Sequence, residues 1–375
     1  MDRIRTLSIY YHEQPVGSMA LHHNLQSAFE YDWEWLNTGF SLNPYSLPLE
    51  KKVFMPKIDP FDGLFGVFAD SLPDGWGRLI VDRLLLKNRM NPMELTSMNR
   101  LAIVGDTGMG ALTYKPDIQL ESLDRSLADF DEIAKECEKV LLTNDSENLD
   151  ALFQLGGSSG GAKPKILTDI EDEPWIIKFP ASSDPKNMGE REYQYSLCAK
   201  ACGIAMENTK LFPSGICSGY FGTRRFDRKK IPGGKTDRIH MISVSALLET
   251  SHRIPNLDYN LLMRLTLDLT KDFAEVEKMY RLMCFNVFAH NRDDHSKNFS
   301  FLYQETQHKW VLSPAYDLTY SNSIGGEHAT CVNGNGKNPG MSDLLGVAEN
   351  IGIKEIKAKK IASEIREACA SLLYT

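Results

Sequence analysis

The stretch of sequence that decides the fold is AHNRDDHSKNFS, residues 289–300. It holds two adjacent carboxylates, Asp293 and Asp294, and an amide, Asn298, five residues after the first of them. A carboxylate can accept the proton of a hydroxyl group, and an amide oxygen is a hard ligand of the kind that Mg²⁺ prefers. The stretch therefore predicts a site where proton transfer takes place beside a divalent cation.

The residues that follow predict a hairpin that returns the chain to this stretch. Residues 299–303 are typical of a strand, and residues 310–312 of its partner. Such a hairpin would bring Asp317 beside Asn298 as a second Mg²⁺ ligand. The spacing from Asp293 to Asn298, D-x-x-x-x-N, is also that of a kinase catalytic loop, so Asp293 is the expected base.

A second interpretation makes the same segment the transition-metal site of a hydrolase. Its ligands would be His290, Asp293, Asp294 and His295. Zinc sites take three or four ligands, and the sequence offers no distant histidine pair at ligand spacing to complete one. We therefore expect His295 to hold the loop through a local hydrogen bond.

A glycine-rich loop lies upstream, at residues 155–165, with the sequence LGGSSGGAKPK. Its glycines let backbone N–H groups turn toward one point and approach a phosphate closely, and the lysines at its end add positive charge. It is not a Walker A loop, which needs G-x-x-x-x-G-K-[ST]. Taken alone, the loop is equally compatible with a flexible surface linker.

Lys178 lies inside the apolar run PWIIKFP, residues 174–180. A lysine in such a strand must meet a counter-charge, and strand lysines that pair with nucleotide phosphates have this setting. The plainer alternative is an edge-strand lysine that faces water. Glu190 and Glu192 open the next helical segment, and either could orient Lys178. Because acidic residues also suit the first turn of any helix, the sequence does not separate these interpretations.

The composition of the whole chain limits its class. It has 375 residues, of which 42% are hydrophobic and 25% charged, so global disorder is excluded and two or three domains are expected. The net charge of -8 argues against a chain that grips nucleic acid through its overall charge. The start lacks the apolar core of a signal peptide, and no apolar run is long enough for a membrane helix. We expect a cytoplasmic protein with no membrane contact.

The seven cysteines are scattered along the chain and include no C-x-x-C pair. This pattern argues against a disulfide scaffold or a zinc ribbon and fits reduced thiols. Cys198 and Cys202 fall on one face of a predicted helix, but two thiols without histidine partners make a poor metal site.

Periodicity predicts several elements outside these motifs. Alternation predicts strands over residues 4–10 and over the aromatic run FEYDWEW, residues 29–35. Apolar residues at helical spacing predict helices over residues 78–90, 124–142, 189–202 and 353–373.

In chain order, the glycine loop, Lys178, the helix glutamate, D-x-x-x-x-N and Asp317 resemble the HipA-like serine/threonine kinase toxins of bacteria. The resemblance covers nearly the whole chain. Four further segments are similar to the small domain in front of that kinase core: FEYD at 29–32, SLPL at 46–49, FADSLPD at 68–74 and GDTGMGAL at 105–112. FDR at residues 226–228 resembles the end of a strand in the same family.

The resemblance implies an α+β, two-lobed protein-kinase-like fold with an additional small N-terminal α/β subdomain. The N-terminal subdomain would span residues 1–118, and the kinase N-lobe with the phosphate loop residues 119–245. The helical C-lobe with the catalytic loop would span residues 246–375.

The resemblance also assigns roles to the candidate residues, with ATP and Mg²⁺ as the cofactors. Asp293, His295 and Lys297 would be catalytic, and Asn298 and Asp317 would bind the metal ion. The ATP site would include Gly156, Gly157, Ser158, Ser159, Gly160, Gly161, Lys165, Lys178 and Glu192. Glu192 is the better match for the partner of Lys178. The segment expected to contact adenine, residues 238–243, matches poorly and leaves the adenine contacts open.

Partners follow from the same resemblance. A small helix-turn-helix antitoxin would bind the chain and bring DNA to it only indirectly, and the substrate would be a protein of the translation machinery. Ser158 and Ser159 are the candidates for autophosphorylation, because a phosphate there would occupy the anion pocket of the nucleotide. Two alternatives stay open: a kinase that acts on a small molecule, and a catalytically inactive co-repressor that works with a DNA-binding antitoxin.

Overall fold

Alternating apolar residues near the start of the chain form an antiparallel sheet of four strands, in the order β3-β2-β1-β4. Its strands are β1 (Thr6–Tyr11), β2 (Gln14–Leu21), β3 (Ser27–Tyr31) and β4 (Leu112–Lys115). In β1 the side chains of Leu7, Ile9 and Tyr11 are buried, so every second residue faces the core. The strand predicted over residues 4–10 is confirmed.

The strand predicted over residues 29–35 is wrong in its second half. β3 ends at Tyr31, and the short helix α1 (Trp33–Thr38) follows. Asp32 caps this helix, because its Oδ1 accepts a hydrogen bond of 2.8 Å from the Glu34 N–H. The alternation of aromatic residues hid this cap, since Trp35 is buried by the helix as it would be by a strand.

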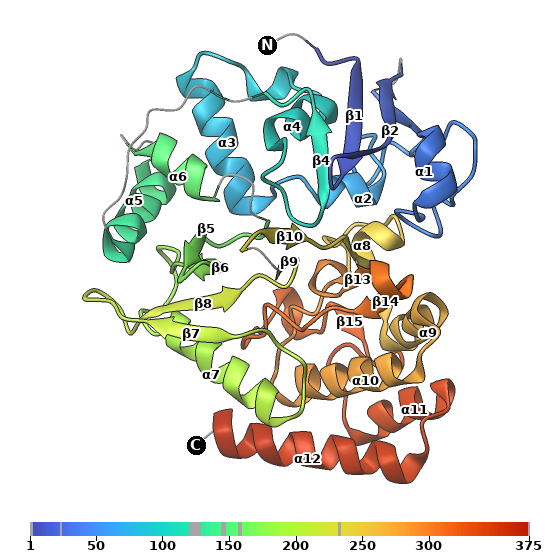
Figure 1. Cartoon of the computed structure of the whole chain (residues 1–375). Coiled ribbons are helices and arrows are strands. Elements are labelled where there is room, and N and C mark those ends of the chain that lie inside the picture. The colour runs from blue at the N-terminus through green and yellow to red at the C-terminus, as the bar shows by residue number, and fades with distance from the viewer. Residues whose placement is uncertain are drawn as a thin grey trace. The chain divides into compact units, whose positions relative to one another are not determined.

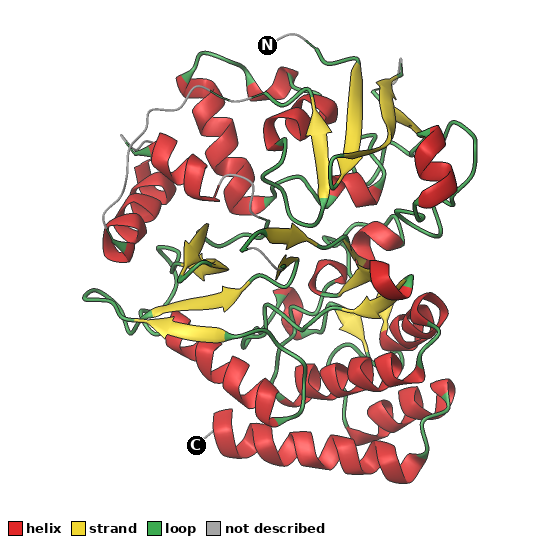
Figure 2. Cartoon of the chain, viewed as in Figure 1, coloured by secondary structure: helices red, strands yellow, loops and turns green. Residues whose placement is uncertain are grey.

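The structure is a computed structural model (Figures 1 and 2), and it describes residues 3–22, 25–118, 120, 129–143, 148–156, 160–231 and 234–373. The chain divides into two compact units. The first consists of Met1–Gly189 and Leu211–Thr250, and the second of Glu190–Lys210 and Ser251–Thr375. This division does not test the three predicted parts, whose boundaries stay a prediction.

A second sheet of the first unit follows the glycine-rich loop. Strands β5 (Lys165–Ile170), β6 (Glu173–Lys178) and β8 (Tyr220–Arg224) are antiparallel neighbours, and β7 (Thr209–Phe212), which spans a boundary between the units, completes the order β5-β6-β8-β7. The other elements of this unit are α2 (Gly66–Ala69), α3 (Gly75–Lys87), η1 (Pro92–Glu94), α4 (Ser97–Val104), α5 (Phe130–Thr143), α6 (Leu149–Gly156), β9 (Arg228–Lys230), β10 (Thr236–Arg238), β11 (Met241–Ser243) and α8 (Val244–Leu247).

One hydrophobic cluster joins the N-terminal region of this unit to the second sheet. Trp76 and Ile80 of α3 belong to the same buried cluster as Cys137 of α5 and Ile166 and Ile177 of β5 and β6. Apolar burial on this scale is the main favourable term in folding. The core is therefore continuous across residue 118, and Figure 1 shows α3 beside α5 and α6.

The second unit is mainly helical, and its helices α9, α10, α11 and α12 pack against one another (Figure 1). Its elements are α7 (Met188–Ala201) from Glu190 onward, β12 (Leu257–Asp258), α9 (Tyr259–Thr270), α10 (Phe273–Phe288), η2 (Ser296–Asn298), β13 (Ser300–Gln304), η3 (Glu305–Gln307), β14 (Lys309–Leu312), η4 (Ile324–Gly326), β15 (Thr330–Cys331), α11 (Met341–Ile351) and α12 (Glu355–Leu373). The antiparallel pair β13–β14 confirms the predicted hairpin. Among the described residues, no helix is both long and apolar enough to span a membrane.

A buried charge cluster fixes the C-terminal end of the second sheet of the first unit to the N-terminal region. Asp227 is fully buried and accepts hydrogen bonds from Arg225, at 2.8 and 2.9 Å, from Arg228 at 2.6 Å, and from the Gly110 N–H at 2.8 Å. Burial would raise the pKa of Asp227, but the charges of Arg225 and Arg228 hold it well below its usual range. Arg228 also donates to the carbonyls of Gly108 and Gly110, at 3.0 and 2.9 Å. The FDR and GDTGMG segments are thus parts of one network.

We expect Asp227→Ala to lower the free energy of unfolding by about 3–5 kcal/mol, because the change leaves buried arginines without their counter-charge. The pKa of Asp227 is lower in the folded chain than in the unfolded chain. The contribution of Asp227 to stability is therefore complete above the unfolded pKa of about 4 and is lost as the pH falls below it. Urea unfolding of the wild type and of Asp227→Ala at several pH values measures this difference in stability.

The matched control is Asp237→Ala, on the same hairpin. Asp237 pairs with His12 at 3.0 Å with 37% of its side chain exposed, so its loss should cost no more than about 1 kcal/mol. Equal losses for the two variants would show that Asp227 has no special role.

Candidate functional site

The predicted catalytic loop begins where α10 ends in the second unit. Ala289 is the C-cap residue of α10, and its backbone N–H donates to the carbonyl oxygens of Phe285 and Val287. His290 then adopts a left-handed conformation with φ of 51°. A non-glycine residue in this region is uncommon and here redirects the chain out of the helix. The loop that follows runs through η2 into β13.

Asp294 anchors this loop from inside the unit. It is buried, and its carboxylate accepts hydrogen bonds from Tyr259 Oη at 2.9 Å and the Thr330 N–H at 3.2 Å, and contacts His328 Nδ1 at 2.9 Å. Tyr259 Oη in turn accepts a hydrogen bond of 2.9 Å from Asn286 Nδ2. Asp294 is therefore a structural residue that ties the loop to α9, α10 and the segment around β15.

Asp293 has the opposite environment. Its side chain is 59% exposed, while its backbone oxygen accepts a hydrogen bond of 2.7 Å from Asn298 Nδ2. Because the amide nitrogen of Asn298 donates this bond, Oδ1 is the side-chain atom of Asn298 that is able to bind a cation. The base and the first metal ligand predicted from the sequence are thus held together across one turn.

His295 shapes this turn, as predicted. Its Nδ1 accepts a hydrogen bond of 3.2 Å from the Lys297 N–H, and its backbone oxygen accepts one of 2.9 Å from the Asn298 N–H. Its Nε2 lies 3.8 Å from Asp293 Oδ1, and its ring packs against that of His252, with the centroids 5.4 Å apart. The imidazole therefore fixes the direction of the segment between Asp293 and Asn298.

Tyr316 brings the segment that carries Asp317 to the loop. Its hydroxyl donates to the Lys297 backbone oxygen at 2.6 Å and accepts from Ser300 Oγ at 2.6 Å. Asp317 follows directly, half-buried, in a left-handed conformation with φ of 57°. Strained backbone of this kind is often found at ligand-binding positions. Hard oxygen donors on two adjoining segments suit Mg²⁺, so the residues present fit the predicted ion.

The ligands of the alternative transition-metal site are not brought together in the part of the chain that the structure describes. Asp294 is engaged by Tyr259, His328 and Thr330 and points away from the exposed Asp293 side of the loop. Within the described part of the chain, no group of three or more potential ligands includes His290, Asp293 or His295.

Part of the glycine loop belongs to the first unit and is held by the N-terminal region. Gly157, Ser158 and Ser159 lie outside the described residues. Gly156 ends α6, and the Gly161 N–H donates to Asp74 Oδ1. The Gly161 oxygen accepts a hydrogen bond of 3.0 Å from the Trp76 N–H, and Gly75, with φ of +44°, lies so close that a Cβ there would be 2.6 Å from this oxygen. A phosphate that bound the Gly161 N–H would therefore have to displace Asp74.

Lys165 and Lys178 lie beside each other on the sheet next to this loop. They are directly opposed partners at the ends of β5 and β6, so their side chains leave the same face. Lys165 is buried, and its ammonium fills the space that a side chain at position 161 would need. The Lys178 ammonium lies over the ring of Phe221, 5.6 Å from its centroid. Two like charges at opposed positions repel each other, and this arrangement favours an anionic ligand.

The structure distinguishes between the two glutamates at the start of α7. Glu192 is buried, whereas Glu190 is exposed. A buried carboxylate needs a partner, which makes Glu192 the stronger candidate for an ion pair. Glu192 and Lys178 belong to different units, so their pairing stays a prediction.

The segment expected near adenine has other bonds within the first unit. Arg238 donates to the carbonyls of Gly108 and Gly110, at 2.9 and 3.0 Å. His240 Nε2 lies 3.1 Å from the Leu42 oxygen, and Ser243 bonds the carboxylate of Asp70 through its N–H and its hydroxyl, at 2.7 and 2.8 Å. These contacts connect residues 238–243 to the N-terminal region.

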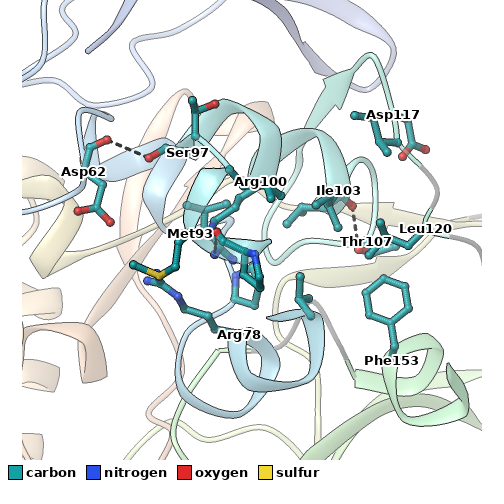
Figure 3. Close-up of a pocket in the computed structure, with 18 of the residues that line it drawn as sticks. Asp62, Arg78, Met93, Ser97, Arg100, Ile103, Thr107, Asp117, Leu120 and Phe153 are labelled. Atoms are coloured by element: carbon teal, nitrogen blue, oxygen red, sulfur yellow. Dashed lines mark hydrogen bonds between the residues drawn. The ribbon is translucent and has the colours of Figure 1, made fainter. Parts of the chain in front are cut away.

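The first unit also contains a cavity of about 630 Å³ between α3, α4 and α6 (Figure 3). Arg100 lies at its wall, where it pairs with Asp82 at 2.7 Å, and Ile103 and Phe153 contribute apolar surface. None of the predicted site residues that the structure describes lines this cavity.

Family models match both parts of the chain. The model of the HipA-like C-terminal domain matches residues 157–373, and that of the HipA N-terminal domain matches residues 7–115. The chain belongs to the HipA-like family.

A solved structure confirms the fold of this HipA-like chain. HipA in the complex of HipA, HipB and operator DNA from Shewanella oneidensis MR-1 is similar with a TM-score of 0.72, over 98% of this chain and 91% of that chain, at 18% identity. The predicted class, an α+β kinase-like fold with a small N-terminal subdomain, is therefore confirmed. The proinflammatory kinase CtkA of Helicobacter pylori matches 57% of this chain and 90% of its own with 14% identity, at a TM-score of 0.36 that is too low to support an inference.

A curated relative matches a smaller part of the chain. The putative kinase Y4dM of Sinorhizobium fredii (strain NBRC 101917 / NGR234) is 26% identical over 155 residues, which are 38% of this chain and 36% of the relative. The match thus spans about a third of that protein.

Several residues that shape the site were missed from the sequence. Tyr259, His328 and Thr330 hold Asp294, Asn286 holds Tyr259, and His252 packs on His295. These residues lie up to 43 positions from the residue that they contact and share no spacing with the loop. The signal that could have found them is the presence of polar residues in otherwise apolar segments, such as Asn286 inside the apolar helix α10.

We expect the neighbouring aspartates to differ in their effect on stability. Asp294→Ala should lower the free energy of unfolding by about 3 kcal/mol or more, because it leaves several buried polar groups without their acceptor. Asp293→Ala, at the exposed position beside it, should change it by less than about 0.5 kcal/mol. Thermal or urea unfolding of the two variants tests this, and equal losses would contradict the roles assigned to them.

Proposed function

We propose that this HipA-like chain is an ATP- and Mg²⁺-dependent protein kinase that phosphorylates serine or threonine. The observation that carries the proposal is the loop from Asp293 to Asn298. It exposes one carboxylate, buries the next, and holds the amide nitrogen of Asn298 on the Asp293 carbonyl. The opposed lysines Lys165 and Lys178 give separate support for a phosphate ligand.

In the proposed mechanism each residue has one task. Asp293 accepts the proton of the substrate hydroxyl as the phosphoryl group is transferred. Asn298 Oδ1 and the Asp317 carboxylate would hold Mg²⁺, which neutralises charge on the phosphates when bound. Lys165 and Lys178 would bind the phosphates, and Glu192 would orient Lys178. His295 positions the turn on which both Asp293 and Asn298 depend, and Lys297, whose backbone oxygen holds Tyr316, extends it toward Asp317.

The proposal extends to the biological setting. The HipA structure from Shewanella oneidensis was solved with HipB and operator DNA, which supports a small DNA-binding antitoxin as the partner of this chain and DNA contact through that partner. The cell compartment would be the cytoplasm, and the substrate a protein of the translation machinery. Autophosphorylation would occur at Ser158 or Ser159.

We expect Asp293→Ala and Asp317→Ala to lose at least about 100-fold in phosphate transfer from labelled ATP, because they remove the proton acceptor and a metal ligand. Incorporation into the chain itself and into proteins of a lysate is measured by gel and by phosphopeptide mass spectrometry. Mapping the peptide with residues 157–159 identifies the modified serine.

The matched control is Asp268→Ala, an aspartate of α9 whose side chain is 59% exposed and pairs with Lys271. We expect this variant to incorporate labelled phosphate at the wild-type rate. ATP binding is measured in parallel, so that a loss of phosphate transfer is distinguished from a loss of nucleotide binding. Labelling of Asp293→Ala and Asp317→Ala at the wild-type rate would refute the catalytic assignment, and a phosphorylated metabolite in place of phosphopeptides would favour a small-molecule kinase.

We expect Glu192→Gln to lower kcat by about tenfold or more while Glu190→Gln leaves it nearly unchanged, because only the buried carboxylate can orient Lys178. A structural role alone would reduce stability without a specific effect on kcat, so unfolding curves accompany the kinetics. Equal effects of the two substitutions on kcat would show that Glu192 does not orient Lys178.

A further inference from the structure

Three buried cysteines converge in the second unit. Cys198 lies on α7, Cys202 directly follows that helix, and Cys369 lies on α12. Their sulfur atoms all lie within 4.8 Å of one another, and the three residues are at most 6% exposed. The sequence placed Cys198 and Cys202 on one face, but the third thiol comes from the other end of the unit.

The surroundings of the cluster determine its chemistry. Among the described residues, no histidine or carboxylate joins this group of potential ligands. The nearby Arg281 donates to the Cys202 backbone oxygen at 3.3 Å and places a positive charge close to the sulfurs. The cluster is therefore a set of three soft sulfur ligands beside one positive charge.

We propose that Cys198, Cys202 and Cys369 form a binding site for one soft monovalent metal ion, of which Cu(I) is the representative. Thiolate sulfur is a soft ligand that selects Cu(I), whereas structural zinc takes four ligands and this group supplies three. The charge of Arg281 offsets part of the negative charge that the thiolates and one monovalent cation carry together, which limits the cost of burying the ion.

The binding step needs no other reactant. The ion enters, its bonds to the three sulfurs form, and the protons of the thiols that become thiolates leave to solvent. No electron is transferred, so neither an oxidant nor a reductant takes part. The site would join α7 to α12 through metal–sulfur bonds, whereas three core cysteines without a metal would act only as small hydrophobic residues.

The test uses the full-length reduced chain without oxygen. Cu(I), supplied as its acetonitrile complex, is titrated in competition with a chromophoric Cu(I) chelator, and Zn(II) is titrated separately. We expect one Cu(I) to be retained per chain, with X-ray absorption showing three sulfur neighbours and no oxygen or nitrogen, and the melting temperature to rise with Cu(I).

Variants assign the site to these residues. Cys369→Ser should weaken Cu(I) binding by about 100-fold or more, since even residues outside the ligand set alter metal affinity by 10–100-fold. Cys284→Ser, a change at a buried cysteine of α10 outside the cluster, should bind as the wild type does. Circular dichroism establishes that each variant folds.

Three results would overturn the proposal. They are the release of all Cu(I) from the wild type to the chelator, a nitrogen or oxygen neighbour in the absorption spectrum, and binding by Cys369→Ser equal to that of wild type. Tighter binding of Zn(II) than of Cu(I) would overturn the choice of a monovalent ion. The wild-type measurements decide the question even if a cysteine variant fails to fold.

Discussion

The first unit depends on a single buried carboxylate. Asp227 is enclosed by Arg225 and Arg228, and it accepts the N–H of Gly110. A buried charge is tolerated only where opposite charges and donors surround it, so these positions cannot move independently. Arg228 also donates hydrogen bonds to the carbonyls of Gly108 and Gly110. A loop from the N-terminal region and a strand end more than a hundred residues later are thereby held as one structure.

A similar constraint organises the second unit, where two adjacent aspartates serve opposite purposes. Asp294 faces inward and is bonded by two distant parts of the chain, α9 through Tyr259 and the segment at β15 through His328 and Thr330. Because successive side chains diverge in an extended segment, anchoring Asp294 turns Asp293 toward solvent. The rigidity of the loop therefore comes from the residue that has no proposed part in the chemistry. Precise placement of a reactive group on a fixed frame is a general requirement of catalysis.

Much of this organisation could be predicted from the sequence. The D-x-x-x-x-N spacing, the hairpin after it and the strand of Lys178 are local patterns, and local patterns are preserved in the fold. The division of labour between Asp293 and Asp294 could not be predicted, because it depends on Tyr259 and His328, which are remote in the sequence. The helix at Trp33–Thr38 was not predicted, because the strand-like alternation of aromatic residues continues past its cap at Asp32. The meeting of Cys369 with Cys198 likewise depends on the packing of distant helices.

The opposed lysines of β5 and β6 have a consequence for nucleotide selectivity. A pair of like charges responds to the amount of negative charge on a ligand and is indifferent to the identity of a base. If phosphates bind at Lys165 and Lys178, adenine and guanine nucleotides would be held there equally well. The segment that could have contacted the base, residues 238–243, is bonded to the N-terminal region through Arg238 and Ser243. Discrimination between nucleotides would then have to arise from a part of the chain distinct from both.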